Sequence, residues 1–188
     1  MSKEHFYRLF KLVEDIEGVY VECGIGGCVS MSKVSELFTR GEAKTRTIYG
    51  YDSFVGLPTP SIHDNYYPPG RTGHPRSTLD RIIEKYSNLT YNITEGWFKD
   101  TLHTYPKEPI AILHLDVDVY MSYKECLETL YQYVQPGGLI LFDEYTGPND
   151  LRKWPGAKRA IDEFFEPLNL PILIDTLSEK AYLIKPPI

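Results

Sequence analysis

Acidic residues gather at two places in the second half of the chain, and their spacing suggests metal chemistry. Asp116 and Asp118 end one apolar run, and Asp143 and Glu144 end the next one. If both runs are neighbouring parallel strands, these four carboxylates meet at one edge of a sheet and repel each other unless protons or a cation intervene. Oxygen ligands favour Mg²⁺, Mn²⁺ or Ca²⁺. The alternative is a set of helix caps and solvated loop acids.

A glycine turn in the first quarter of the chain suggests a small-molecule site. Glu22 precedes Gly24 and Gly26 between a predicted strand and a predicted helix, where glycines let the backbone approach a ligand closely. No Gly-Lys-Ser or Gly-Lys-Thr follows the turn, which excludes a phosphate-cradling P-loop. Glu22 would repel a pyrophosphate and suit a cationic amino group. A tight turn without a ligand is the alternative.

The next predicted strand ends in Asp52. An acid at this position can accept hydrogen bonds from both hydroxyls of a ribose. Dinucleotides and S-adenosylmethionine share this feature, so Asp52 does not separate them, and alone it also fits a surface acid. His114 lies inside an apolar strand, two residues before Asp116. A histidine there is more often a core residue than a catalyst.

The elements that position these residues alternate between strands and helices. We expect strands at 19–23, 47–52, 90–93, 110–116 and 139–143, and helices at 3–15, 29–38, 77–87, 122–134 and 156–166. Such alternation predicts a parallel sheet covered on both faces, with ligands at the carboxyl ends of the strands. Residues 172–174 and 181–184 suit a closing hairpin. The sequence therefore predicts an α/β fold: one doubly wound, Rossmann-like domain over 1–188, mostly parallel, with a C-terminal antiparallel hairpin.

Residues 57–76 form the one long segment without periodicity, and they are rich in Pro, Gly, His and Tyr. A loop of this length in a compact domain is often a lid or a binding loop. Its ring-bearing residues could contact a ligand, and they are His63, Tyr66, Tyr67 and His74. A mobile surface loop without a role is the alternative.

Composition narrows the class of protein. The 188 residues carry a net charge of −6, which argues against binding to a nucleic-acid backbone. No apolar run is long enough to cross a bilayer, and the charged N-terminus shows no signal-like core. The three cysteines predict reduced thiols and a cytoplasmic location.

Several motifs together resemble the macrocin O-methyltransferase family of class I S-adenosylmethionine-dependent, metal-dependent sugar O-methyltransferases. They run from about residue 18 to about residue 166 and comprise Glu22-Cys-Gly-Ile-Gly-Gly, Tyr51-Asp-Ser-Phe-Val-Gly-Leu-Pro, Gly96-Trp-Phe-Lys-Asp-Thr-Leu, Leu115-Asp-Val-Asp-Val-Tyr, and Pro136-Gly-Gly with Asp143-Glu-Tyr. The Asp-Ser-Phe-x-Gly-Leu-Pro and Leu-Asp-x-Asp-x-Tyr blocks are the most specific.

The resemblance implies a role for each matching residue. The methionine part of the cofactor would lie against the glycine turn, the ribose against the end of the second strand, and the adenine against the segment after the third. The implied cofactor-binding residues are Glu22, Gly24, Gly26, Asp52, Ser53, Gly96, Trp97, Phe98 and Asp116. Asp116, Asp143 and Glu144 would bind Mg²⁺ or another divalent cation. The catalytic residues would be Asp118, as the base, and Asp116. Glu144 stands where the family usually has a second Asp.

The sequence thus predicts methyl transfer from S-adenosylmethionine to a hydroxyl, on a sugar of a glycoside or natural product. The partner is a small-molecule or glycan acceptor, with no nucleic acid or membrane, and a homo-oligomer stays open. Two alternatives remain. An NAD(P)-linked oxidoreductase is compatible with Asp52, although the full Gly-x-Gly-x-x-Gly pattern is missing. A non-catalytic homologue that binds S-adenosylmethionine is the other.

Overall fold

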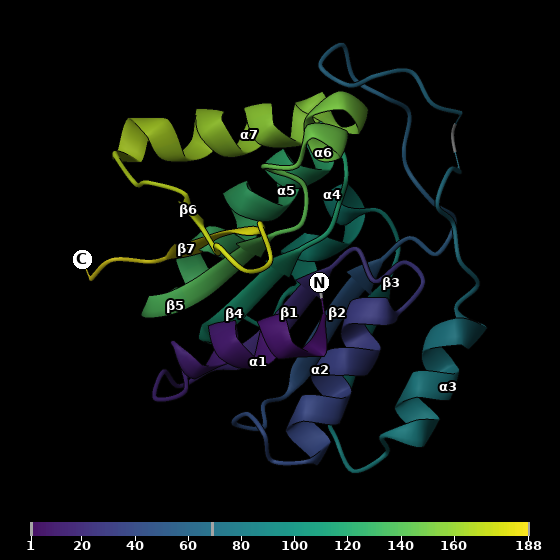
Figure 1. Ribbon diagram of the computed structural model, residues 1–188. Helices are drawn as coiled ribbons and strands as arrows, with labels where there is room; N and C mark the ends of the chain where they lie inside the picture. Colours follow the sequence, from purple (N-terminus) through teal and green to yellow (C-terminus); the bar gives the residue numbers. More distant parts are fainter. Residues whose placement is uncertain (1, 69, 188) are drawn as a thin grey trace.

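The computed structural model describes residues 2–68 and 70–187, apart from the side chains of residues 148–150. All described strands join one seven-stranded sheet in the order β3-β2-β1-β4-β5-β7-β6 (Figure 1). Five strands are parallel, and β7 pairs antiparallel with both β5 and β6. This confirms the predicted doubly wound α/β fold with its C-terminal hairpin. The strands are β1 Val19–Cys23, β2 Ile48–Asp52, β3 Tyr91–Glu95, β4 Ile110–Leu115, β5 Val134–Phe142, β6 Leu173–Ile174 and β7 Ala181–Ile184.

Helices cover both faces of the sheet (Figure 1). One face carries α1 Lys3–Lys11, α2 Val29–Thr39 and α3 Ser77–Lys85, and the other carries α4 Phe98–Thr101, α5 Tyr120–Leu130, α6 Pro148–Lys153 and α7 Pro155–Phe165. Short 3-10 turns follow three of these helices at Leu102–Thr104, Tyr131–Tyr133 and Glu166–Leu168. None of the helices in the described part of the chain has the length and apolarity needed to cross a membrane.

The central strands are apolar because both of their faces are buried. Every residue of β1 and β4 is buried. Alternate residues supply two separate cores, so that Val21 and Leu113 face α5 and α7 while Tyr20 and Ile112 face α1 and α2. Full burial of one such side chain stabilises the fold by roughly 1.5–3 kcal/mol. These two cores hold the carboxyl ends of β1 and β4 in fixed positions.

Several element boundaries differ from the sequence-based expectation. The helix predicted over 122–134 starts at Tyr120 and ends at Leu130, and Val134 already belongs to β5. Residues 136–138, which precede the strand predicted at 139–143, lie within β5 as an irregular stretch. The β4–β5 register jumps there from Val134 to Leu139, and Gly137 has a positive φ of 80°. Helices α4 and α6 were not predicted, because four to six residues are too few to show a helical period.

The described residues of the loop 57–76 form no helix or strand, as predicted, and backbone hydrogen bonds close the neck of the loop. The amide of Leu57 donates to the carbonyl of Arg71 at 2.9 Å, and the amide of Gly70 donates back to the carbonyl of Leu57 at 3.1 Å. Asp64, in the middle, accepts the amide of Tyr120 at the start of α5 at 2.9 Å. The segment is therefore an Ω-shaped loop fastened at its neck and at its centre.

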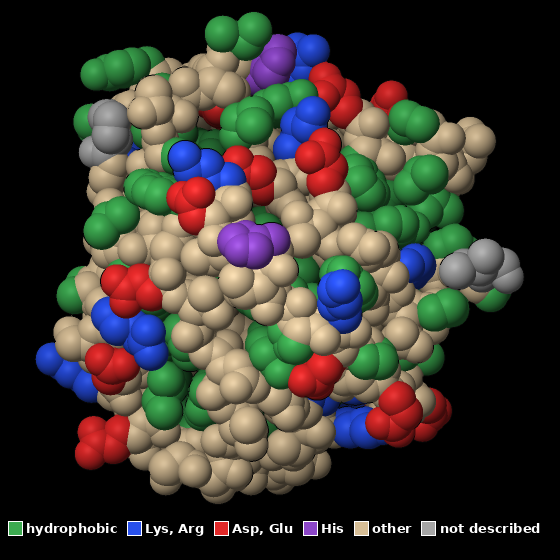
Figure 2. Space-filling model, turned by 180° about the vertical axis from the view of Figure 1, so that it is seen from behind, with side chains coloured by type: hydrophobic (Ala, Val, Ile, Leu, Met, Phe, Trp, Pro, Cys, Tyr) green, Lys and Arg blue, Asp and Glu red, His purple; other side chains and the backbone are tan. Residues whose placement is uncertain are grey.

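Charged side chains of both signs share the surface, and the cysteines lie in the interior. On the face shown in Figure 2, basic side chains are interspersed with acidic ones. The three cysteines, Cys23, Cys28 and Cys126, are buried and form no disulfide.

Candidate functional site: a cavity at the carboxyl ends of the strands

A cavity of about 710 Å³ opens at the carboxyl ends of β1, β2 and β4. The chain reverses its strand order between β1 and β4, and ligands of doubly wound sheets bind at that point. The volume falls in the range of small-molecule and cofactor sites. Most of the predicted site residues line this cavity, namely Gly24, Gly26, Asp52, Ser53, Gly96, Trp97, Phe98, Asp116, Asp118 and Asp143.

The glycine turn is required by a close crossing of two backbone segments. Gly24 has φ +83°, and a Cβ atom there would lie 1.8 Å from the carbonyl oxygen of Asp116. Only glycine therefore allows the β1 loop to pass beneath the β4 loop. At Gly26, with φ +48°, a Cβ atom would meet nothing within 4 Å. The turn thus packs tightly at its base and stays open toward the cavity.

Asp52 is held at the cavity wall by two backbone amides. One carboxylate oxygen accepts from Gly26 at 2.8 Å, and the other accepts from Phe54 at 2.6 Å. A carboxylate has about four acceptor positions, so these bonds leave room for the hydroxyls of a ribose. Trp97 and Phe98, at the start of α4, add aromatic surface to the same cavity. This combination fits a nucleoside.

Glu22 lies one layer behind the cavity wall. It is fully buried, and its carboxylate accepts from the hydroxyl of Ser30 at 2.5 Å and from that of Tyr20 at 2.7 Å. Burial raises the pKa of Glu22 to about 7. Ser30, in the first turn of α2, itself lines the cavity. The contact predicted between Glu22 and the cofactor stays a prediction, and Ser30 is the side chain through which it would act.

His114 also reaches the cavity, although sequence reasoning favoured a core role. Its Nδ1 atom lies 3.2 Å from the hydroxyl of Tyr20 and 3.9 Å from a carboxylate oxygen of Glu22. Its Nε2 atom is buried without a hydrogen-bond partner. Burial lowers the pKa of His114 to about 4, so the ring is neutral at neutral pH. The imidazole is both a core side chain and part of the cavity wall.

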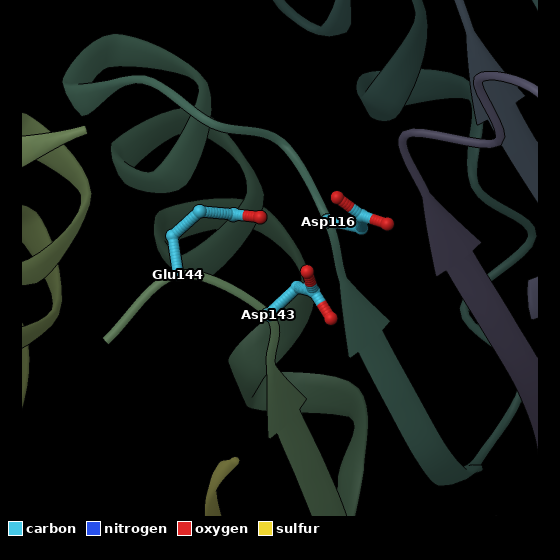
Figure 3. A group of neighbouring side chains, drawn as sticks. All are labelled: Asp116, Asp143 and Glu144. Atoms are coloured by element: carbon cyan, nitrogen blue, oxygen red, sulfur yellow. The ribbon is translucent and has the colours of Figure 1, made fainter. Parts of the chain in front are cut away.

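The acidic residues after β4 and β5 converge as predicted (Figure 3). Asp116, Asp143 and Glu144 each place a carboxylate oxygen within 4.8 Å of the others. Burial raises the pKa of Asp116 well above its usual range, and the charges of Asp143 and Asp118 raise it further. Burial and the charge of Asp116 likewise raise the pKa of Glu144. The three oxygens fit a hard divalent cation, which would relieve this repulsion.

Two of these acids already have polar partners. Lys180, just before β7, places its Nζ atom 3.0 Å from a carboxylate oxygen of Asp143 and 2.6 Å from that residue's carbonyl oxygen. Burial, the largest single influence, would raise the pKa of Asp143, but the charge and the hydrogen bond of Lys180 together with weaker interactions outweigh it, and the pKa lies below its usual value. Glu144 accepts from the hydroxyl of Tyr123 at 2.8 Å. The cluster is therefore partly neutralised by the protein itself.

Asp118, the predicted base, lines the cavity beside this cluster. Its φ of +59° is unusual for a residue with a side chain, and its amide donates to Glu144 at 3.2 Å. Such strained backbone is found most often at functional sites. The hydrogen bond to Glu144 therefore links the predicted base to the predicted metal ligands.

The cavity also contains residues that the sequence analysis did not assign. Ser30, Lys99 and Glu125 are polar examples, and Phe6 of α1 is an apolar one. Of the four ring-bearing residues considered in the loop 57–76, His74 lines this cavity, whereas Tyr66 and Tyr67 line a smaller one near Trp154. Of these residues, only Ser30 could have been found from the sequence, because it lies in the first helical turn after the glycine motif.

The fold and the cavity together define a Rossmann-like α/β protein with a small-molecule site at the switch point of its sheet. Residues 10–179 match the sequence pattern of a known family, the macrocin O-methyltransferases. The chain belongs to this family, as its motifs predicted.

Named relatives and solved structures agree with this assignment. Demethyldecarbamoylnovobiocin O-methyltransferase of Streptomyces niveus is 29% identical over 165 residues, covering 80% of this chain and 59% of the relative. Mycinamicin III 3''-O-methyltransferase of Micromonospora griseorubida is 28% identical over 168 residues, covering 81% and 62%. This chain thus spans about three fifths of the length of these relatives.

Among solved structures, the calicheamicin methyltransferase CalS11 superposes with a TM-score of 0.82 at 26% identity, covering 97% of this chain and 77% of that one. The O-methyltransferase NovP superposes with a TM-score of 0.80 at 24% identity, covering 98% and 79%. These likenesses establish the Rossmann-like O-methyltransferase fold for nearly the whole chain.

Proposed function

We propose that the protein transfers a methyl group from S-adenosylmethionine to a sugar hydroxyl of a small glycoside or natural product. The observation that carries this proposal is the cluster of Asp116, Asp143 and Glu144, in which the two aspartates line a cavity that also fits a nucleoside and Glu144 lies buried behind them. The relatives support the acceptor class, since their names describe O-methyltransferases of novobiocin and mycinamicin precursors.

The cavity supplies a group for each part of the cofactor. Asp52 would accept the ribose hydroxyls, with Ser53 beside it, and Trp97 and Phe98 would flank the adenine. Gly24, Gly26 and Asp116 would surround the methionine part. S-adenosylmethionine supplies an electrophilic methyl group on a sulfonium that leaves readily. The residues of the chain must therefore orient the acceptor oxygen in line with that methyl group and remove its proton.

The acidic cluster accounts for the removal of the proton. Asp116, Asp143 and Glu144 would hold a divalent cation such as Mg²⁺, whose charge would favour the deprotonated form of the acceptor hydroxyl. Asp118, fixed through its amide to Glu144, then accepts the hydroxyl proton on its carboxylate. Glu144 fills the role of the aspartate usual in the family. Its longer side chain is held by Tyr123, which keeps its oxygen within reach of the other two acids.

Calorimetry with S-adenosylhomocysteine and with NADH tests the cofactor directly. We expect binding of the first and not of the second, and the reverse would favour an oxidoreductase. Methyl transfer is then measured on a panel of deoxysugar glycosides and sugar nucleotides, with and without a chelator. Chelation should abolish turnover while S-adenosylhomocysteine still binds, and Mg²⁺ should restore it. Binding without turnover on every acceptor would favour a non-catalytic homologue.

Two variants separate the proposed base from the proposed metal ligands. Asp118→Asn should lose turnover but bind Mn²⁺ as the wild type does, whereas Asp143→Asn should lose both. Glu17→Gln, an exposed acid paired with Lys44, is the control and should change neither property. Full turnover in excess chelator would contradict the role of the metal.

A further inference from the structure

A second cavity, of about 330 Å³, lies between the loop 57–76 and the junction of α6 and α7. Its floor is aromatic, since Tyr67 and Trp154 are 3% and 5% exposed and their rings pack edge to face at 5.7 Å. Asn65 fastens its two sides together, because its side-chain amide donates to the carbonyl of Arg152 in α6 at 2.5 Å (Figure 1). The cavity is therefore built by two segments that lie far apart in the sequence.

Three basic side chains line this second cavity, Arg71, Arg152 and Lys153. The guanidinium carbon of Arg71 lies 5.8 Å from the centre of the Trp154 ring, and Nζ of Lys153 lies 5.4 Å from it. No acidic side chain is among the described residues that line the cavity. Positive charge is thus concentrated around one indole ring, in a chain whose net charge is −6.

These basic side chains suit a phosphate group. Phosphate carries more charge and more acceptor oxygens than a carboxylate, and the planar fork of an arginine matches two of those oxygens at once. A volume of about 330 Å³ is at the lower end for small-molecule sites, so the cavity fits a phosphate or diphosphate group better than a whole cofactor. Tyr66, which is 88% exposed and lines the same cavity, leaves room for a larger group to continue outward.

The neck of the Ω-shaped loop separates the second cavity from the first. Arg71 lines the second cavity, and Thr72, the next residue, lines the first. Leu57 also lines the first cavity, and its amide donates to the carbonyl of Arg71. A ligand in the first cavity therefore has to pass only this stretch of backbone to reach the basic side chains.

The proposed base lies close to the other side of the second cavity. Gly156, in the first turn of α7, allows a tight contact with the start of α5, because a Cβ atom there would lie 2.9 Å from Cβ of Tyr120. Gly156 is two residues from Trp154, and Tyr120 is two residues from Asp118. This contact fixes the floor of the second cavity relative to the residue that would take the proton.

We propose that the second cavity binds a phosphate group carried by the methyl acceptor, so that the acceptor is a phosphorylated sugar or a sugar nucleotide and not a neutral glycoside. This rests on the proposed function, since it assigns the acceptor of that reaction. Arg71, Arg152 and Lys153 would hold the phosphate while a hydroxyl of the same sugar faces Asp118. They are positioning residues that select a charged acceptor.

Calorimetry with inorganic pyrophosphate tests the cavity without an acceptor. S-adenosylhomocysteine fills the first cavity during the titration, and a chelator keeps metal from binding the probe. The double variant Arg71→Gln/Lys153→Gln should bind pyrophosphate at least about tenfold more weakly than the wild type. Arg40→Gln/Lys85→Gln is the matched control, because it removes the same two charges and Lys85 also lies over an aromatic ring, that of Tyr86. It should stay within about twofold of the wild type.

An equal loss in both double variants would mean that only the overall charge matters, and it would overturn the proposal. Absence of pyrophosphate binding by the wild type at millimolar concentration would overturn it as well. All four substituted side chains are exposed, so both variants should fold and melt like the wild type.

Kinetics with three acceptors that share one sugar test the assignment to the acceptor. They are the sugar nucleotide, the sugar 1-phosphate and the neutral methyl glycoside. Arg71→Gln/Lys153→Gln should raise KM for the phosphorylated acceptors at least about tenfold, keep kcat within about twofold, and leave the neutral glycoside unchanged. In the wild type, the phosphorylated acceptors should have the lower KM, and equal values would overturn the proposal without any variant. S-adenosylhomocysteine binding without turnover on any acceptor would instead overturn the proposed function, and calorimetry would still decide whether the cavity binds phosphate.

Discussion

Lys180 should weaken the binding of a divalent cation to the acidic cluster, and Lys180→Met should therefore strengthen it. The Nζ atom lies 3.0 Å from a carboxylate oxygen of Asp143. A hard cation bound to the same carboxylate oxygen at about 2.0–2.6 Å would thus lie at most about 5.6 Å from the ammonium nitrogen. Methionine keeps the length and the apolar stem of the side chain and removes only the charge.

The magnitude follows from this separation. At about 5 Å and an effective dielectric constant of about 20, each unit of ionic charge is repelled by about 3 kcal/mol. The side chains of Lys180 and Asp143 are 20% and 24% exposed, so solvent and salt reduce the repulsion. We take about 2 kcal/mol as the net effect, which corresponds to roughly thirtyfold in affinity.

Electron paramagnetic resonance with Mn²⁺ measures the free ion directly and so gives the dissociation constant. Lys44→Met is the matched control, because it removes the same charge from a lysine far from the acidic cluster. Lys44 pairs with Glu17 and lies just before β2, at the amino ends of the strands. Without metal, Lys180→Met should also melt at a lower temperature than the wild type, because Asp143 loses its counter-charge, and Mn²⁺ should recover the difference. Unchanged or weaker Mn²⁺ binding by this variant would refute the electrostatic argument.

Four further predictions concern stability, the cofactor and the loop. Burial raises the pKa of Glu22 from 4.5 to about 7, so the folded state retains a proton that the unfolded state releases, and stability falls as pH rises through that window. In urea titrations, the free energy of unfolding of Glu22→Gln should fall less between pH 5 and pH 8 than that of the wild type. Equal losses would contradict the raised pKa of Glu22. Asp52→Ala should weaken the binding of S-adenosylhomocysteine and of 5'-methylthioadenosine alike by at least about tenfold in calorimetry, since both carry the ribose. Weaker binding of only one of these ligands would contradict the role of Asp52. Gly24→Ala should cost at least about 3 kcal/mol in the same urea titrations, because its Cβ meets a carbonyl oxygen at 1.8 Å, whereas Gly41→Ala, with φ +65° and open space, should cost only about 1 kcal/mol. If the loop 57–76 is a lid, hydrogen exchange in its two arms should slow when cofactor and acceptor are both present, and an unchanged pattern would leave it a surface loop.

The sheet and most of the cavity wall were predictable because the relevant signals are local. Buried parallel strands appear as apolar runs, and β4 and β5 are each followed by the acids that converge in the structure. The adjacency of β4 and β5, and of β1 and β2, followed from the rules of doubly wound sheets. Asp52 and Asp116 could therefore be assigned to one edge without coordinates.

The remaining features depend on contacts between distant segments. Lys180 comes from the closing hairpin and meets Asp143 only because β7 pairs with β5. The burial of Glu22 depends on the hydroxyls of Tyr20 and Ser30, and no sequence pattern says whether an acid at a strand end faces a ligand or a neighbouring side chain. That Nε2 of His114 is buried without a hydrogen-bond partner can be seen only in the folded structure.

The Ω-shaped loop also bears on how members of such a family can diverge. Its neck is closed by backbone hydrogen bonds between Leu57, Gly70 and Arg71, so the ends stay in place whatever the loop between them contains. Lengthening a flexible loop of fixed ends costs little, about 0.6 kcal/mol for each doubling. Asp64 divides the loop into two arms, and the anchor on α5 lets one arm change length without moving the other. Residues beside the cavity can in this way be exchanged or inserted while the sheet and the acidic cluster keep their geometry.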